Sequence, residues 1–103
     1  MGTTAGPTFT FTARLWEYPG KGAWYFVSVP PEQAEDIRHL TEGRRGGFGS
    51  VKVGVAINGS RWSTSLFSSS TDGTFILPVK KAIRQAEQVH AGDPVTVVLE
   101  LLL

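Results

Sequence analysis

The sequence predicts a small β-barrel, mainly β with α+β content, that forms one domain over residues 8–103. Three observations support this prediction. A chain of 103 residues, 41% of them hydrophobic, is long enough to bury one core, and without Cys it is not a disulfide scaffold. Several short segments alternate apolar and polar residues, which is typical of strands with one buried face. Two strands run into a proline and a helical pattern, which predicts two short helices beside six strands.

The first half of the chain contains two predicted strands and one helix. Residues 1–7 are expected to be a flexible N-terminus. Residues 8–17 alternate strictly and predict a half-buried strand. Residues 23–29 are apolar on both faces and predict an inner strand that forms a hairpin with the first. Pro31 suits the first position of a helix, which is expected to run to about Leu40.

The second half begins with a predicted hairpin. Alternation predicts strands at residues 51–57 and 61–67. They are joined by Asn58-Gly59, the strongest hairpin signal in the chain, because a type I′ turn needs positive φ at both central residues. A polar loop is expected at residues 68–73.

A strand, a helix and a last strand are expected to complete the domain. Residues 74–77 predict a short strand, and Pro78 is expected to open a helix that runs to about Val89. The residues of this helix that are expected to face inward are Val79, Ala82, Ile83 and Ala86. Residues 95–103 are apolar at every odd position, which predicts a strand with one fully buried face.

The two strand-proline-helix units align at an offset of 48 positions, with Pro30 matching Pro78 and Val29 matching Leu77. A pseudo-twofold barrel built from two similar halves would leave this pattern. Proline is also a common first residue of helices, which explains the pattern equally well. Both interpretations stay open on the sequence.

Charge is distributed unevenly along the chain, although the net charge is only +1. Residues 44–84 contain seven Lys or Arg and one Asp, a balance of +6, whereas residues 1–43 and 85–103 are acidic. Such asymmetry can focus an electrostatic field on one face. We therefore expect a basic face that binds an anion. The residues expected on it are Arg44, Arg45, Arg61, Trp62, Lys80, Lys81 and Arg84.

Three of these cations, Lys80, Lys81 and Arg84, belong to the first turns of the predicted second helix, where the helix macrodipole disfavours positive charge. A bound anion would reverse this effect, since free backbone N–H groups and lysines together form a cradle for phosphate or carboxylate. The alternative is that these side chains are solvated or pair with acidic residues of the first helix.

The loop at residues 43–50 has glycines beside Arg44 and Arg45, as phosphate-binding loops often have. Its spacing does not fit GxxxxGK[ST], and it precedes a strand where a dinucleotide loop would open a helix. It also differs from the GxxG clamp of KH domains, because that clamp joins two helices. A mobile basic loop is the favoured interpretation.

Several aromatic residues are candidates for a binding surface. Trp16 falls on the polar face of the first strand, and either Trp24 or Tyr25 has to point away from the main core because neighbours on a strand face oppositely. Together with Trp62 beside Arg61, they could line a stacking surface or a pocket. A second small core under the helices explains them about as well.

No residue pattern indicates catalysis, so an enzyme that works without a recognisable motif stays open only as a third and less favoured class, and no cofactor is expected. His39 and His90 lack a second nitrogen or sulfur ligand nearby, so no metal site is expected. The serines occur without a GxSxG or SxxK motif. No apolar run approaches the roughly 18 residues of a membrane helix, and residues 1–7 do not resemble an export signal. A cytoplasmic location without a membrane partner is therefore expected.

Five runs of residues together resemble a known family. They are Trp24–Val27 followed by Pro30, Gly47–Val51, Trp62–Phe67, Leu77–Arg84, and Gly92-Asp93 before a final strand. The family is the domain of unknown function numbered nineteen-oh-five, and the resemblance covers nearly the whole chain. It implies a bacterial source and an association with bacteriocin-protection, OmpD-associated proteins. For the fold it implies a double-split β-barrel similar to that of AbrB-like and MazE-like proteins, and for activity it implies almost nothing.

The stretch from Leu77 to Val95 is also similar to the strand-proline-helix-Gly-Asp-strand unit of AbrB-like DNA-binding proteins, an architectural similarity that transfers no function. Those proteins usually dimerise to complete the barrel, whereas two units in one chain could complete it alone, so a monomer or a homodimer is expected. The expected function is a non-enzymatic module that binds an anionic small molecule or an acidic partner on the basic face. Nucleic-acid binding through the same face is the alternative.

Overall fold

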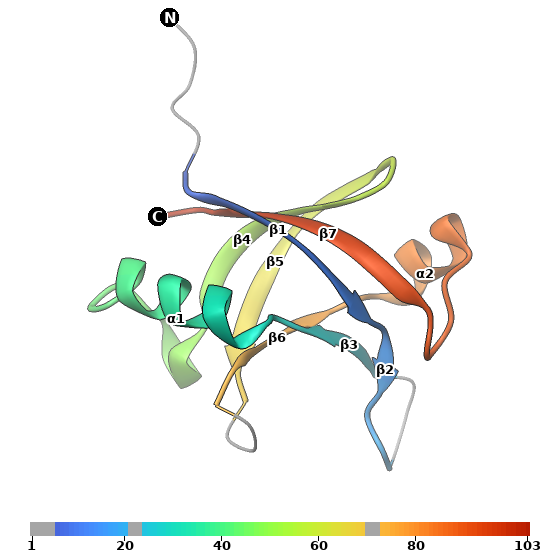
Figure 1. Ribbon diagram of the computed structural model, residues 1–103, viewed down its shortest axis with the longest axis horizontal. Coiled ribbons are helices and arrows are strands. Elements are labelled where there is room, and N and C mark those ends of the chain that lie inside the picture. The colour runs from blue at the N-terminus through green and yellow to red at the C-terminus, as the bar shows by residue number, and fades with distance from the viewer. Residues whose placement is uncertain (1–5, 21–23, 70–72) are drawn as a thin grey trace, which may run out of the picture.

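The computed structural model describes residues 6–20, 24–69 and 73–103, which form a nearly closed β-barrel flanked by two short helices (Figure 1). The strands are β1 (Thr8–Arg14), β2 (Trp16–Glu17), β3 (Tyr25–Ser28), β4 (Val51–Ile57), β5 (Ser60–Ser68), β6 (Phe75–Pro78) and β7 (Pro94–Leu101). The helices are α1 (Pro31–Leu40) and α2 (Lys81–Glu87), and η1 (Gly47–Gly49) is a 3-10 turn. The prediction of a mainly β barrel with two short helices is confirmed.

The first predicted strand is divided in two by Leu15, which is why the sheet has seven strands where six were expected. The backbone N–H of Leu15 donates to the carbonyl oxygen of Asp93 (2.9 Å), and its own carbonyl oxygen accepts from Gly92 (2.7 Å). Beyond this residue, Trp16 pairs with Phe26 of β3 instead of continuing along β7. The chain thus leaves one sheet and enters the other at Leu15.

All strand pairs are antiparallel, in the order β1-β7-β4-β5-β6-β3-β2. The strands at the two ends of this order, β1 and β2, belong to one continuous segment, so the chain itself joins the two edges of the nearly closed barrel. The long strand β5 makes the opposite corner, because residues 60–66 pair with β4 and residues 67–68 pair with β6.

The strand pairing relates residues 8–57 to residues 60–101 as two similar halves. Each half consists of a corner strand, a short strand, a helix and a last strand: β1/β2, β3, α1, β4 in the first and β5, β6, α2, β7 in the second. The two short strands pair with each other, and so do the two last strands. This connectivity is that of a pseudo-twofold barrel, and it favours the structural interpretation of the repeat.

The equivalent positions lie 50 residues apart rather than 48. The N–H of Val29 donates to the carbonyl oxygen of Phe75, and the N–H of Val79 donates to that of Tyr25, both at 2.9 Å. Adding 50 to the residue numbers of the first half converts Val29 into Val79 and Tyr25 into Phe75, so each bond is the counterpart of the other. Val29 therefore corresponds to Val79. The expected match of Pro30 with Pro78 is therefore wrong.

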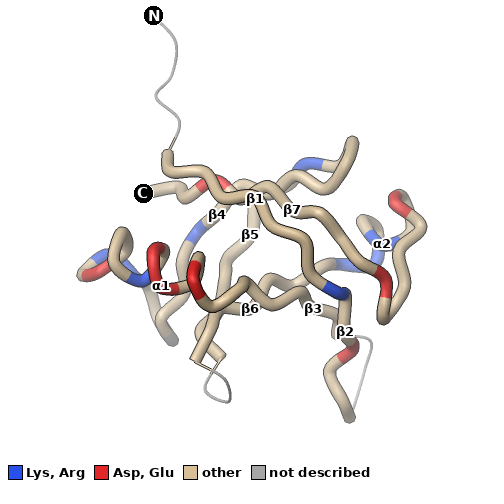
Figure 2. The backbone as a smooth tube through the Cα atoms, in the orientation of Figure 1, with Lys and Arg blue, Asp and Glu red and all other residues tan. Residues whose placement is uncertain are grey.

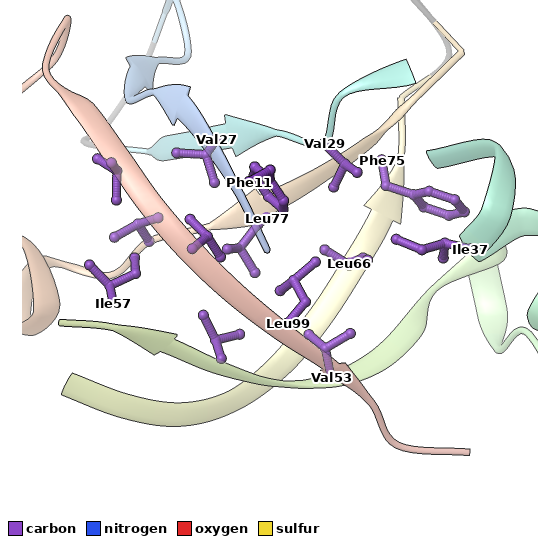
Figure 3. Close-up of a cluster of buried hydrophobic side chains, with 14 of the residues drawn as sticks. Phe11, Val27, Val29, Ile37, Val53, Ile57, Leu66, Phe75, Leu77 and Leu99 are labelled. Carbon is purple, nitrogen blue, oxygen red and sulfur yellow. The ribbon is translucent and has the colours of Figure 1, made fainter. Parts of the chain in front are cut away.

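The core fills the barrel with side chains from alternate strand positions, as the sequence pattern predicts. Its largest contributions come from Val51, Val53, Val55 and Ile57 of β4 and from Val95, Val97, Leu99 and Leu101 of β7. Figure 3 shows Leu66, Leu77 and Leu99 pointing toward one another from three different strands. The last expected core residue, Leu103, lies beyond β7 and is exposed.

Helix α1 has its predicted bounds, begins at Pro31 and buries Ala34 and Ile37. Helix α2 differs from its prediction: Pro78 is the last residue of β6, and the helix begins at Lys81 and ends at Glu87. Val79 and Ile83 are buried as expected.

Two alanines expected to face inward from α2, Ala82 and Ala86, are exposed. With the helix beginning at Lys81 and comprising seven residues, Ile83 is its buried residue. The second helix therefore covers the barrel with much less apolar surface than the prediction implies.

The predicted turns have mixed outcomes. Ile57 and Ser60 pair directly, which confirms the hairpin, but only Asn58 (φ 53°) of its two turn residues has positive φ. Of the expected flexible N-terminus, residues 1–5 lie outside the described part of the chain. The backbone N–H of Gly6 donates to the carboxylate of Glu100 (3.0 Å), so this residue of the expected flexible segment is attached to β7. The predicted loops near residues 18–22 and 68–73 also lie partly outside the described residues.

Candidate functional site

A pocket of about 370 Å³ lies where the start of α2 approaches β3 and β5. We call it the α2 pocket. It is lined by Trp24, Tyr25, Trp62, Ser63, Thr64, Pro78, Val79, Lys80, Lys81 and Arg84. Its volume is within the range of small-molecule sites. The sequence thus places aromatic and basic side chains from three separate segments around one cavity.

The aromatic walls are set by the strand pleat. Tyr25 and Trp62 are half-buried and pack against the end of the barrel core. Trp24, next to Tyr25, faces the opposite side of the strand, where its ring stacks with that of Phe26 (centroids 6.4 Å apart, planes at 11°). Because Trp24 is 60% exposed, it stands at the rim of the α2 pocket.

Arg84 is held in place inside the α2 pocket. Its guanidinium carbon lies 3.8 Å from the centroid of the Tyr25 ring, a cation–π contact. Its Nε donates to the carbonyl oxygen of Val79 (3.2 Å). Within the described residues, the two Nη atoms have no hydrogen-bond or ion-pair partner. The charged end of this side chain is therefore positioned but not neutralised.

Lys80 and Lys81 are exposed beside Arg84. Neither forms an ion pair with any residue that the structure describes. The acidic helix α1, which was the alternative partner, lies on the opposite side of the barrel (Figure 2), and its Glu35 contacts Arg38 and His39 at 3.4 Å. Pairing between the two helices is therefore absent from the described part of the chain.

An Arg–aromatic contact also occurs at the other end of the barrel. The guanidinium of Arg38 on α1 lies 5.3 Å from the ring centroid of Phe75, the residue equivalent to Tyr25. Arg38 donates to the carbonyl oxygen of Gly73 (2.7 Å) and to the carboxylate of Glu35 (3.4 Å). Here the ring is fully buried and the arginine is used within the protein.

Trp16 does not reach the α2 pocket. Its ring packs on Phe26 (centroids 5.1 Å apart), and its Nε1 donates to the Ser28 hydroxyl (3.0 Å). Tyr18 and Trp24 also contact Phe26. The expected second small core thus exists as an aromatic cluster on the outer face of β2 and β3 rather than under the helices.

The remaining candidate cations lie elsewhere. Arg61 is exposed on β5 and lines a neighbouring depression, which shares Trp62 and Ser63 with the α2 pocket and also contains Glu100. Arg44 and Arg45 follow α1 on the far side of the barrel, and Arg45 donates to the carbonyl oxygen of Arg38 (3.0 Å) and to the hydroxyl of Thr41 (3.1 Å). The predicted residues therefore do not form one basic face. Those that lie together, around the α2 pocket, are Trp62, Lys80, Lys81 and Arg84.

The residues that line the α2 pocket but were not among the predicted site residues are Ser63, Thr64, Pro78 and Val79. The proximity of Ser63 and Thr64 to Trp62 was the only available signal for them. In the ranges 6–20, 24–69 and 73–103, no three His, Cys, Asp or Glu side chains gather in a way that would hold a metal ion. The α2 pocket thus offers cations, hydroxyls and aromatic rings, which are binding groups.

A helix long and apolar enough to cross a membrane does not occur among the described residues. A search of curated proteins finds no match to the sequence. A family model described as Domain of unknown function (DUF1905) matches residues 11–99, which include every residue of the α2 pocket.

Proposed function

We propose that this chain, which belongs to the family described as Domain of unknown function (DUF1905), is a non-enzymatic module that binds a small anionic ligand in the α2 pocket. The observation that carries the proposal is the state of Arg84. Its guanidinium is fixed by Tyr25 and Val79, while both Nη atoms lack a partner among the described residues. A planar guanidinium whose two Nη groups are free presents one edge that can donate two parallel bonds to a carboxylate or phosphate, and charge-assisted bonds of this type are the strong ones.

The surroundings of Arg84 support the same proposal. Lys80 and Lys81 add two positive charges at the pocket, and none of the residues that line it is acidic. The half-buried rings of Tyr25 and Trp62 shield the inner part of the site from water, and this strengthens an electrostatic contact made beside them. A small anion would therefore gain more from this pocket than from cations spread over an open surface.

Nucleic-acid binding is the competing proposal, and the arrangement of cations favours it less. A duplex or a single strand needs a row of phosphate contacts. Arg44 and Arg45 are separated from the α2 pocket by the width of the barrel (Figure 1), and Arg61 lines a neighbouring depression together with the acidic residue Glu100.

We also propose that the barrel is of the AbrB-like double-split type, and that the protein is bacterial and cytoplasmic. The crossing of β1/β2 and β5 between the two sheets supports a double-split barrel. Both halves come from one chain, which supports a monomer.

The proposal is tested by titrating the ¹⁵N-labelled protein with benzoate, inorganic phosphate and adenosine monophosphate, with benzamide and adenosine as neutral controls. We expect an anion to shift the indole N–H signals of Trp24 and Trp62. The Trp16 signal is an internal control, because its N–H is bonded to Ser28 outside the pocket. The proposal fails when no anion shifts the two pocket signals, or when the neutral compounds shift them equally.

A matched pair of variants locates the site. Lys80→Ala with Arg84→Ala removes two charges from the α2 pocket, and Arg44→Ala with Lys52→Ala removes two exposed charges elsewhere. Anion binding is expected to weaken by at least about tenfold in the first double variant only. Fluorescence anisotropy of labelled DNA and RNA at about 50 and about 200 mM salt tests the competing proposal, since phosphate contacts give a steep loss of affinity with salt.

A further inference from the structure

The aromatic residues that line the α2 pocket indicate the shape of the uncharged part of the ligand. Three aromatic rings supply flat surfaces at the pocket. Tyr25 belongs to β3, Trp24 directly precedes that strand, and Trp62 belongs to β5. Three rings around a cavity of about 370 Å³ leave room for a molecule of one or two rings. A flexible aliphatic chain would not need flat walls.

The rings are held in position without a ligand. Trp62 packs against the barrel core opposite Val55 of β4. Trp24 is braced by stacking on Phe26, and Tyr25 is covered on one side by Arg84. Because little ordering is left to occur on binding, flat walls that are fixed in advance select a flat ligand.

The position of Arg84 fixes where the acidic group lies. Its guanidinium occupies one face of Tyr25, so a ligand ring has Trp62 within the pocket and, at the rim, the face of Trp24 that Phe26 does not cover. The acidic group of a ligand can meet the Nη atoms of Arg84, and Ser63 and Thr64 are the neutral hydroxyl-bearing residues among those that line the pocket.

We infer that the ligand of the α2 pocket is a planar aromatic acid, in which a carboxylate or phosphate binds Arg84 and the ring stacks on Trp24 or Trp62. This inference rests on the proposed function and narrows it, because an anion alone would satisfy that function. Stacking between aromatic rings adds a contribution beyond the burial of area, and a saturated ring of the same size lacks it.

The test compares benzoate with cyclohexanecarboxylate, which has the same charge and nearly the same size but is neither flat nor aromatic. Affinities are measured from the indole N–H shifts of Trp24 and Trp62. Benzoate is expected to bind about 5- to 10-fold more tightly. Equal affinities would overturn the aromatic inference and leave the anion site standing. Binding of inorganic phosphate alone would also overturn the aromatic inference, whereas no binding of either carboxylate, of adenosine monophosphate or of inorganic phosphate would overturn both.

Two variants assign the stacking surface. Trp24→Leu is expected to leave the fold intact because the side chain is 60% exposed, and Trp62→Leu is checked for folding by the dispersion of its amide signals. At least one of them is expected to reduce the preference for benzoate to about twofold or less while cyclohexanecarboxylate still binds. A preference that survives in both variants would contradict the inference.

Adenosine monophosphate distinguishes two sources of the same chemistry. Tighter binding of adenosine monophosphate than of benzoate would assign the acid to a nucleotide phosphate, and the reverse order would assign it to an aromatic carboxylate. Both results support the inference when the shifts of Trp24 and Trp62 exceed those of Trp16.

Discussion

Helices α1 and α2 occupy equivalent places in the two halves of the barrel, but they cover its ends differently. Helix α1 has ten residues and seals its end with Ala34 and Ile37, which are 1% and 0% exposed. Helix α2 has seven residues, and its Ile83 is 8% exposed. The pocket lies beside the shorter helix, where Tyr25 and Trp62 stay partly accessible.

The two Arg–aromatic contacts show the same difference. Arg38 covers a buried ring and donates to groups of the protein, whereas Arg84 covers a half-exposed ring and keeps its Nη atoms free of described partners. One end of the barrel is thus organised for stability. The other end gives up packing and retains charged and aromatic groups that can meet a ligand, which is how binding sites commonly arise on stable scaffolds.

Replacing the central isoleucine of each helix should give the largest effect. Ile37→Ala is expected to lower the free energy of unfolding by about 4 kcal/mol, because the side chain is fully enclosed and leaves a cavity. Ile83→Ala is expected to cost about 2 kcal/mol, since its surroundings are more open. Urea unfolding of both variants measures the difference. Equal losses would show that α2 seals its end as well as α1 does.

Removing the two arginines should separate stability from binding. Arg38→Ala is expected to cost about 1–2 kcal/mol, because the variant uncovers Phe75 and loses the bond to the Gly73 carbonyl. Arg84→Ala is expected to cost less than about 1 kcal/mol, since the Tyr25 ring is already half-exposed. Thermal unfolding measures both values. A larger loss of stability in Arg84→Ala than in Arg38→Ala would contradict the assignment of Arg38 to stability and of Arg84 to binding.

The end of α2 is attached to the β4–β5 hairpin by a polar contact. The Glu87 carboxylate accepts from the hydroxyl of Ser60 (2.5 Å) and the amide of Asn58 (3.1 Å). Glu87→Ala is expected to cost about 1 kcal/mol because both bonds are lost at a partly solvated site. The exposed residue Gln85, changed to Ala, is the control and should be neutral within about 0.5 kcal/mol. A neutral Glu87→Ala in the same urea unfolding assay would show that α2 needs no such attachment.

The sequence predicts the strands and α1 well because their signals are local. Alternation has a period of two in strands, so the buried faces of β4 and β7 can be assigned without the fold. The start of α2 is different. Pro78 cannot donate a backbone hydrogen bond, yet it ends a strand, and Val79 continues the pairing through its bond to Tyr25. That pairing comes from a residue more than 50 positions away, so no local pattern indicates it.

The candidate site was only partly predictable for the same reason. Lys80, Lys81 and Arg84 are neighbours in sequence and stay neighbours in the fold. Arg44 and Arg45 share their sign and the same basic segment, but the barrel separates them, because charge balance along a chain does not say which side of a sheet each loop reaches. Pairing between strands decides that question, and it is non-local.

The smallest expected effect concerns Lys81, and it has opposite signs for stability and for binding. Lys81 is the first residue of α2, where a positive charge opposes the helix dipole and an acidic one favours it. Lys81→Glu is therefore expected to raise the free energy of unfolding by about 0.5 kcal/mol. The same change places a carboxylate at the α2 pocket and should weaken benzoate binding severalfold through repulsion. Lys81→Gln separates the two causes, because removing one charge should give about half of each effect. A variant that gains stability and keeps its affinity would show that Lys81 takes no part in the site, and that the cations of α2 owe their placement to something other than a ligand.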